Sequence, residues 1–128
     1  MQQTLSRRRQ KSLILIRARE VAANLSVPVS LLDAEGNLIF FNEAAEAMHG
    51  VAFEDIGELS ADEWPKLFAT APLEELPVGT ALFERRPVHT VVHFTGADDV
   101  DRSVAVTAFP LMGREGELFG VFAIFWHL

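Results

Sequence analysis

The sequence predicts an α+β domain: one five-stranded antiparallel sheet, short helices on one of its faces, and a helix ahead of the first strand. Three observations support this prediction. Two short runs of strand-forming residues, 29–32 and 38–41, flank a turn segment, which indicates a hairpin. Prolines interrupt the helical pattern of the middle third. Alternating or wholly apolar runs fill the last third, which is typical of a strand meander.

The hairpin and the segment after it have specific local signals. Asp33 offers a carboxylate to the backbone amides of the turn, and Gly36 permits positive φ. Asn42 ends the second strand and can cap a helix over Glu43–Met48, with Gly50 able to close that helix. These signals predict a strand, a turn, a strand and a capped helix within 23 residues.

The residues before the first strand predict a helix over Lys11–Leu25, because apolar residues recur along it at spacings of three and four. Leu13, Leu15 and Ile16 widen its apolar surface. We therefore expect the helix to cover its own sheet and also to meet a second copy of the chain; packing on the sheet alone is the alternative. The residues predicted for the dimer contact are Ile14, Ala18, Val21 and Leu25.

The rest of the chain predicts short helices followed by strands. Pro65, Pro72 and Pro77 divide the helical stretch 53–76 into single turns and short helices. The predicted strands of the last third are 88–95, 102–112 and 118–128, and the last is apolar enough to be central and covered on both faces.

Composition limits the function. The 128 residues suit one domain, and their charge of −7 is uneven: residues 1–19 hold six basic and no acidic residues, and all 18 acidic residues follow. We expect the basic start to be a solvated helix end. The acidic remainder should repel nucleic acid, so we expect no binding of DNA or RNA by the domain itself. No apolar run approaches the ~20 residues of a membrane span, and we expect a cytoplasmic protein without a membrane partner.

The predicted order of elements from Leu25 to Leu128 resembles that of a PAS domain, a sensory and interaction module. The positions that support this resemblance are Asp33, Gly36, Asn42, the helix start 43–46, Pro110 and the run 116–124. The segment before Leu25 is similar to the flanking helix through which many PAS domains pair. We therefore divide the chain into a flanking dimerisation helix, 1–25, and a PAS domain, 26–128. His127 and Leu128 stand where members of larger signalling proteins often have an Asp-Ile-Thr junction, so the chain is either free-standing, which we favour, or a fragment.

The resemblance implies a ligand cleft between the inner face of the sheet and the helices after the hairpin. Strand alternation, combined with the resemblance, predicts that this inner face is formed by Ile39, Phe41, Val104, Val106, Phe122 and Ile124. Met48, Phe53, Trp64, Leu67 and Phe68 are predicted to close it, and His93 to reach it as a polar contact. Such a cleft suits a flat or aliphatic ligand. A filled interior is the alternative.

Several chemistries are disfavoured by residue type or spacing. His89 and His93 would stand ~13 Å apart on one strand, too far to share a metal ion. No histidine lies between Glu54 and Leu82, where PAS sensors commonly hold heme, and the absence of cysteine excludes a covalent flavin adduct. Asp98, Asp99 and Asp101 predict a solvated turn rather than a calcium loop.

Function follows from these observations as an expectation. We expect a non-enzymatic sensory or regulatory PAS domain that dimerises and docks a signalling protein, with a small ligand in the cleft shifting those contacts. A structural interaction module with a filled core is the alternative, and a small enzyme using Asp33, His49 or His93 is a third hypothesis, for which no nucleophile or oxyanion site is evident.

Overall fold

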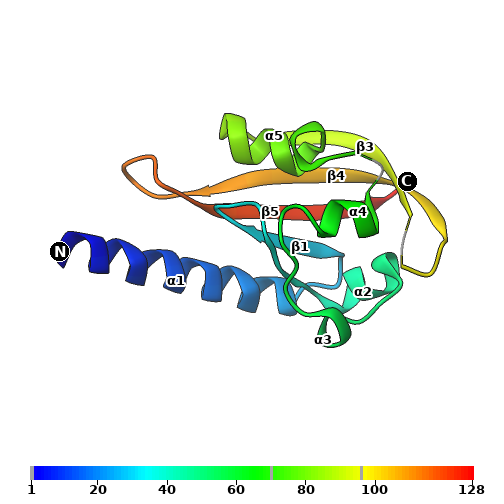
Figure 1. The fold of residues 1–128 in the computed structure, drawn as a ribbon, viewed down its shortest axis with the longest axis horizontal. Helices are drawn as coiled ribbons and strands as arrows, with labels where there is room; N and C mark the ends of the chain where they lie inside the picture. Colours follow the sequence, from blue (N-terminus) through cyan, green and yellow to red (C-terminus); the bar gives the residue numbers. More distant parts are fainter. Residues whose placement is uncertain (1, 70, 96) are drawn as a thin grey trace.

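The computed structural model describes the backbone of residues 2–69, 71–95 and 97–128, and the side chains of residues 13–69, 71–93, 97–126 and 128. The five predicted strands form one antiparallel sheet in the order β2-β1-β5-β4-β3. Helix α1 lies on one face of this sheet, and the shorter helices lie on the other (Figure 1). The elements are α1 (Gln2–Ala23), β1 (Val29–Asp33), β2 (Leu38–Phe41), α2 (Glu43–His49), α3 (Phe53–Ile56), α4 (Trp64–Phe68), the 3-10 helix η1 (Leu73–Glu75), α5 (Pro77–Glu84), β3 (Val88–Thr95), β4 (Asp101–Met112) and β5 (Leu118–His127).

The predicted fold class is confirmed, and two helices differ from the sequence prediction. Helix α1 begins nine residues before Lys11, at Gln2. Helix α5 was not predicted, because its segment starts with a proline and includes Gly79. The proline sits in the first turn, where its missing N–H costs nothing. Gly79 is required because a Cβ there would lie 1.8 Å from the carbonyl oxygen of Leu73.

The hairpin turn forms as its residues predict. The carboxylate of Asp33 accepts hydrogen bonds from the backbone amides of Glu35 (3.0 Å) and Asn37 (2.9 Å). Gly36 has φ +86°, and its carbonyl accepts a hydrogen bond from the indole of Trp64 at 2.9 Å. The turn therefore fixes α4 over the sheet as well as joining β1 to β2.

The sheet separates two apolar clusters. The larger one lies under the short helices and includes Leu32, Phe41 and Val106, whereas the smaller one lies under α1 and includes Leu31 and Phe122. In the smaller cluster, Leu15, Ala18 and Ala22 of α1 face the sheet.

Three residues predicted for the inner face lie on the α1 side instead: Ile39, Phe122 and Ile124. In β5, Phe122 pairs with Leu31, so both side chains share the face under α1. Strand β5 is apolar on both faces, and its sequence pattern therefore did not specify which of its residues face the short helices. In β2, a register irregularity turns Ile39 and Phe40 to the same side.

Asn42 joins three elements through one buried side chain that is 1% exposed. Its Oδ1 accepts hydrogen bonds from the amides of Ala45, which caps α2, and Val29, which begins β1, both at 3.0 Å. Its Nδ2 donates to the carbonyls of Ala22 (2.8 Å) and Val27 (2.9 Å). The end of α1, the start of β1 and the start of α2 are thus fixed relative to one another.

We predict that Asn42→Ala lowers the free energy of unfolding by at least about 3 kcal/mol. The substitution removes a helix cap and leaves several buried backbone groups without a partner. Chemical denaturation measures the effect, with Asn24→Ala as the control, because the side chain of Asn24 is exposed and its described hydrogen bond goes to the carbonyl of Glu20. A loss below 1 kcal/mol for Asn42→Ala would contradict this assignment.

Candidate functional site

A partly open cavity of about 70 Å³ lies between the sheet and the short helices. Its walls are mostly apolar and come from both layers. The sheet contributes Leu32, Leu38, Val92, Val106 and Phe125, and the helical layer contributes Trp64, Phe68, Ala69, Leu76, Pro77 and Val78. Three polar residues also line it: Ser30, His49 and His93. An apolar cavity with few polar groups is the usual form of a small-molecule site.

Eight of the twelve residues predicted for the cleft lie at the cavity or in the core around it. Trp64, Phe68, His93 and Val106 line the cavity. Phe41, Met48 and Val104 are buried in the same core, and Phe53 packs against it.

Leu67 was predicted to close the cleft, but it is 41% exposed and lies outside that core. Successive helix residues are about 100° apart, and α4 turns Trp64 and Phe68 inward. Leu67 therefore points to the side.

His49 is one of the two polar cavity residues, with Ser30, that the cleft prediction omitted. It ends α2 and is 6% exposed, and its Nε2 lies 3.3 Å from the hydroxyl of Ser30. Its ring centroid lies 4.3 Å from that of Phe68 and 4.6 Å from that of Phe41. Its position was available in the sequence, because His49 follows Ala45 by four residues on the buried face of α2.

Burial controls the charge of this histidine. Desolvation and, to a smaller extent, the positive charge of Arg102 together lower the pKa of His49 from 6.5 to about 3. The imidazole is therefore neutral at physiological pH. Ser30 and His49 form a buried, uncharged polar pair in the cavity lining, whereas His93 is exposed and contacts the hydroxyl of Ser103.

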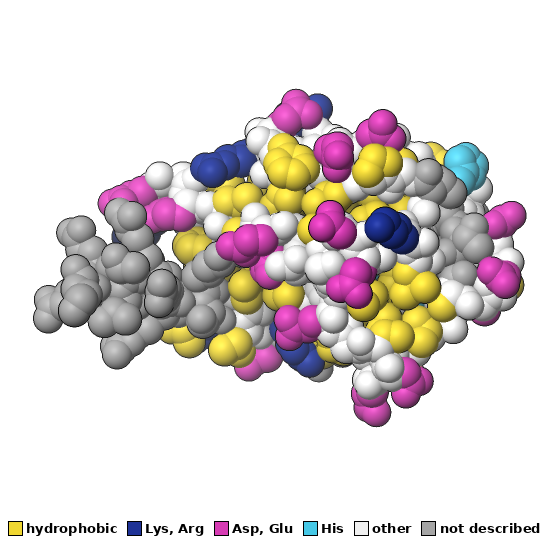
Figure 2. All heavy atoms as spheres, in the orientation of Figure 1, with side chains coloured by type: hydrophobic (Ala, Val, Ile, Leu, Met, Phe, Trp, Pro, Cys, Tyr) yellow, Lys and Arg dark blue, Asp and Glu magenta, His cyan; other side chains and the backbone are white. Residues whose placement is uncertain are grey.

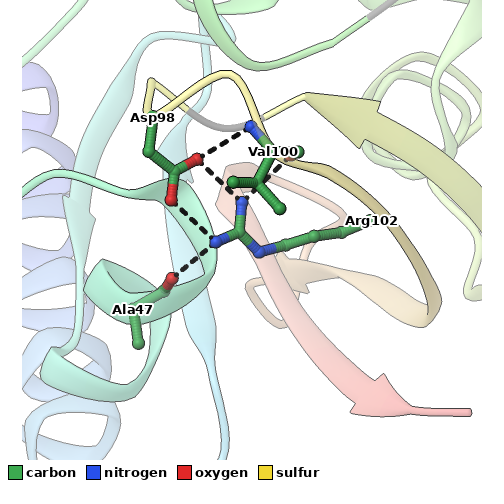
Figure 3. A network of polar contacts seen from close by, with 4 residues as sticks. All are labelled: Ala47, Asp98, Val100 and Arg102. Atoms are coloured by element: carbon green, nitrogen blue, oxygen red, sulfur yellow. Dashed lines mark hydrogen bonds and ion pairs between the residues drawn. The ribbon is translucent and has the colours of Figure 1, made fainter.

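The connection between β3 and β4 holds the last turn of α2, which bears His49. The guanidinium of Arg102 donates to the carboxylate of Asp98 at 2.9 and 3.0 Å and to the carbonyl of Ala47 at 3.3 Å (Figure 3). The amide of Ala97 donates to the carbonyl of His49 at 2.6 Å. The hydrogen bonds from Arg102 lower the pKa of Asp98 to about 2. Asp98 is exposed, as the predicted solvated turn requires, and its carboxylate holds the guanidinium of Arg102 beside α2.

Of the residues predicted for the dimer contact, Ile14, Ala18 and Val21 lie on α1, and Leu25 lies two residues beyond its end. Ala18 packs against the sheet, whereas Val21 is 56% exposed and Leu25 is 38% exposed. Ile14 is half-buried and lies seven residues before Val21, on the same flank. Helix α1 therefore has an exposed apolar flank in addition to the side that covers the sheet. The side chains of the basic residues at positions 7–9 and 11 lie outside the described residues.

The rest of the described surface carries charged and polar side chains, with exposed hydrophobic residues such as Phe83, Val91 and Trp126 among them. Acidic side chains are spread over the face formed by the short helices, with hydrophobic side chains between them (Figure 2). His89 contacts the hydroxyl of Thr107, and His93 contacts that of Ser103. Among the described residues, no three His, Cys, Asp or Glu side chains are grouped as metal ligands would be. Within the same part of the chain, none of the helices combines the length and apolar character of a membrane span.

Comparison with known proteins identifies the family. A family model described as the PAS fold matches residues 22–128. The chain belongs to the PAS family. Its membership supports a sensory or regulatory role in general terms. Among curated proteins, no match is found.

Solved structures show the same fold at low sequence identity. The light-oxygen-voltage (LOV) protein of Rhodobacter sphaeroides has a TM-score of 0.70 and 18% identity over 87% of this chain, which spans 65% of that protein's length. The PAS domain of Bordetella pertussis BvgS has a TM-score of 0.63 and 18% identity, over 89% of this chain and 84% of that domain. The PAS domain of an HTR-like protein from Haloarcula marismortui has a TM-score of 0.65 and 20% identity, with coverages of 88% and 95%.

We predict that His49 makes the domain less stable as pH falls below about 6.5. Below this pH, His49 of the unfolded chain is protonated, whereas His49 of the folded protein stays neutral down to about pH 3. The free energy of unfolding therefore decreases by up to about 1.4 kcal/mol for each unit by which the pH falls. Denaturation of the wild type and of His49→Gln between pH 7.5 and pH 5 isolates this effect, because the other titrating groups are common to both. Equal pH slopes in the two proteins would contradict a buried, neutral His49.

Proposed function

We propose that this chain is a non-catalytic regulatory PAS domain, which pairs with a second copy through α1 and in which a small ligand in the cavity shifts that pairing. The observation that supports this proposal is the position of Asn42. Its side chain caps α2, which bears the cavity residue His49, and also binds the carbonyl of Ala22 near the end of α1. A change at the cavity therefore has a short, hydrogen-bonded route to the helix that presents the exposed apolar flank.

A second contact joins α1 to the helical layer around the edge of the sheet. The guanidinium of Arg19 lies 4.6 Å from the ring centroid of Phe40 on β2 and 5.6 Å from that of Phe53, the first residue of α3. Phe53 in turn packs edge-on against Phe41 at 5.2 Å in the larger core. Cation–π contacts of this kind are worth about 0.5–1 kcal/mol at exposed sites. They provide an additional dependence of α1 on the packing around the cavity.

The composition of the cavity favours regulation over catalysis. Ser30 and His49 lie within reach of each other, as a nucleophile and a base would. Acyl transfer also requires polar donors aimed at a developing oxyanion. Apart from these two residues and His93, the described residues that line the cavity are apolar.

The partners that this surface favours are proteins. The apolar flank of α1 suits a second copy of the chain, and a signalling protein would bind the dimer. Because acidic side chains cover the helical face, we propose that the domain binds neither nucleic acid nor an anionic membrane (Figure 2). A filled, purely structural module remains the competing function, and mass spectrometry of small molecules extracted from the purified protein distinguishes the two.

We predict that Val21→Glu weakens self-association at least tenfold, because it places a carboxylate in an apolar contact. Size-exclusion chromatography with light scattering, over a concentration series, measures the effect. Ala23→Glu is the matched control: it adds the same charge at an exposed position about 160° around α1 from Val21. A wild-type chain that is monomeric at every concentration, or equal association of the two variants, would contradict the proposed interface.

A further inference from the structure

We infer that the cavity takes a small, uncharged molecule with a short alkyl portion and one hydrogen-bonding group, which lies against the Ser30–His49 pair. This inference rests on the proposed function, because it names the ligand class of the same site.

The volume limits the size of the ligand. A cavity of about 150 Å³ accommodates benzene, which has six non-hydrogen atoms. The cavity here measures about 70 Å³, so the enclosed portion of a ligand has about three or four such atoms. Because the cavity is partly open, a slightly longer molecule can extend toward solvent. A large planar cofactor does not fit without rearrangement of Trp64 or Phe68, which line the cavity and are at most 8% exposed.

The walls disfavour a charged ligand. Val78, Val92 and Val106 supply apolar surface, and an ion that leaves water for such surroundings requires a buried counter-charge. The cation whose charge acts on His49 is Arg102, at the start of β4. Its guanidinium is bonded to Asp98 and to the carbonyl of Ala47, and Arg102 is not part of the cavity lining. Its positive charge repels an ammonium group, and its bonds to Asp98 reduce its attraction for a carboxylate.

The polar pair suits a single hydroxyl or amide group. A serine hydroxyl both donates and accepts a hydrogen bond, and a neutral imidazole has one donor and one acceptor nitrogen. The hydroxyl oxygen of Ser30 on β1 lies 3.3 Å from Nε2 of His49 on α2, and both residues are buried. One ligand group can therefore form hydrogen bonds to both. A hydroxyl, which donates and accepts, matches this pair with either tautomer of His49.

The experiment compares three molecules that share a three-carbon chain: propan-1-ol, propionate and propylammonium. Each is titrated at pH 7.5 and constant ionic strength into the full chain with ¹³C-labelled methyl groups, and the shifts of Val78, Val92 and Val106 are followed by NMR. Molecules of four or five non-hydrogen atoms bind at best with Kd of about a few to tens of micromolar and usually far more weakly, so titrations extend to about 100 mM. We expect propan-1-ol to shift these methyl signals saturably and to bind at least tenfold more tightly than either ion.

Two variants locate the site. Ser30→Ala is expected to weaken the binding of propan-1-ol about fivefold, since it removes one hydrogen-bonding partner. Val106→Phe is expected to fill the cavity and abolish the shifts, and Val91→Phe, at a residue 50% exposed on the other face of the sheet, is the matched control. If Val106→Phe does not fold, Ser30→Ala alone decides the assignment. Equal or tighter binding of an ion, no shift with any of the three, or an unchanged affinity in Ser30→Ala would overturn the inference.

The outcome is separable from that of the proposed function. Light scattering on the same samples reports self-association, which does not depend on the methyl signals. Selective binding of propan-1-ol without a change in association would retain the ligand class and remove the regulatory proposal. A dimer that binds no molecule of this series would remove the proposed ligand class and leave the proposed pairing in place.

Discussion

The structure depends on the hydrogen bonds of Asn42 more than on any other single side chain. One amide group serves as the cap of α2, the partner of the first amide of β1 and the donor to the last turn of α1. These three segments belong to different layers of the fold, so apolar packing alone would not fix their relative positions. A buried amide with all its bonds made is stabilising, whereas the same groups unpaired would be costly. The fold therefore contains a polar junction between the helix outside the sheet and the helix beside the cavity.

The cavity and α1 lie on opposite faces of the sheet, and the sheet separates their apolar clusters. Coupling between them must pass through the sheet or around its edge. Helix α2 is connected at both of its ends: through its N-cap Asn42 and, at the last turn, through the bonds from Arg102 and Ala97. Because His49 is the last residue of α2 and itself accepts the bond from Ala97, a ligand that moves it would strain the last turn and, through the helix, the cap at Asn42. This arrangement gives the proposed regulation a physical basis that a filled core without polar groups would lack.

Local signals predicted much of this fold, and tertiary context decided the rest. Asp33, Gly36 and Asn42 act through hydrogen bonds and backbone conformation within a few residues, so the hairpin and α2 followed from the sequence. The apolar run of β5 has no alternation, so the sequence prediction placed Phe122 and Ile124 on the wrong face of the sheet. The pairing of β5 with β1 determines which face they occupy. Helix α5 was not predicted because it contains Gly79, a poor helix former. This glycine is needed for the close approach of α5 to the carbonyl of Leu73, which the sequence pattern does not reveal. The role of His49 depends on its burial, which only the packing of α2 against the sheet determines.

The central claim is that the cavity and the pairing of α1 are energetically coupled. The most direct test is the dissociation constant of the dimer, measured by analytical ultracentrifugation with and without saturating propan-1-ol. Linkage requires that a ligand favouring one state of α1 change this constant, and the account predicts a change of about fivefold or more. The same constant in both conditions, with the cavity shown to be occupied, would contradict it.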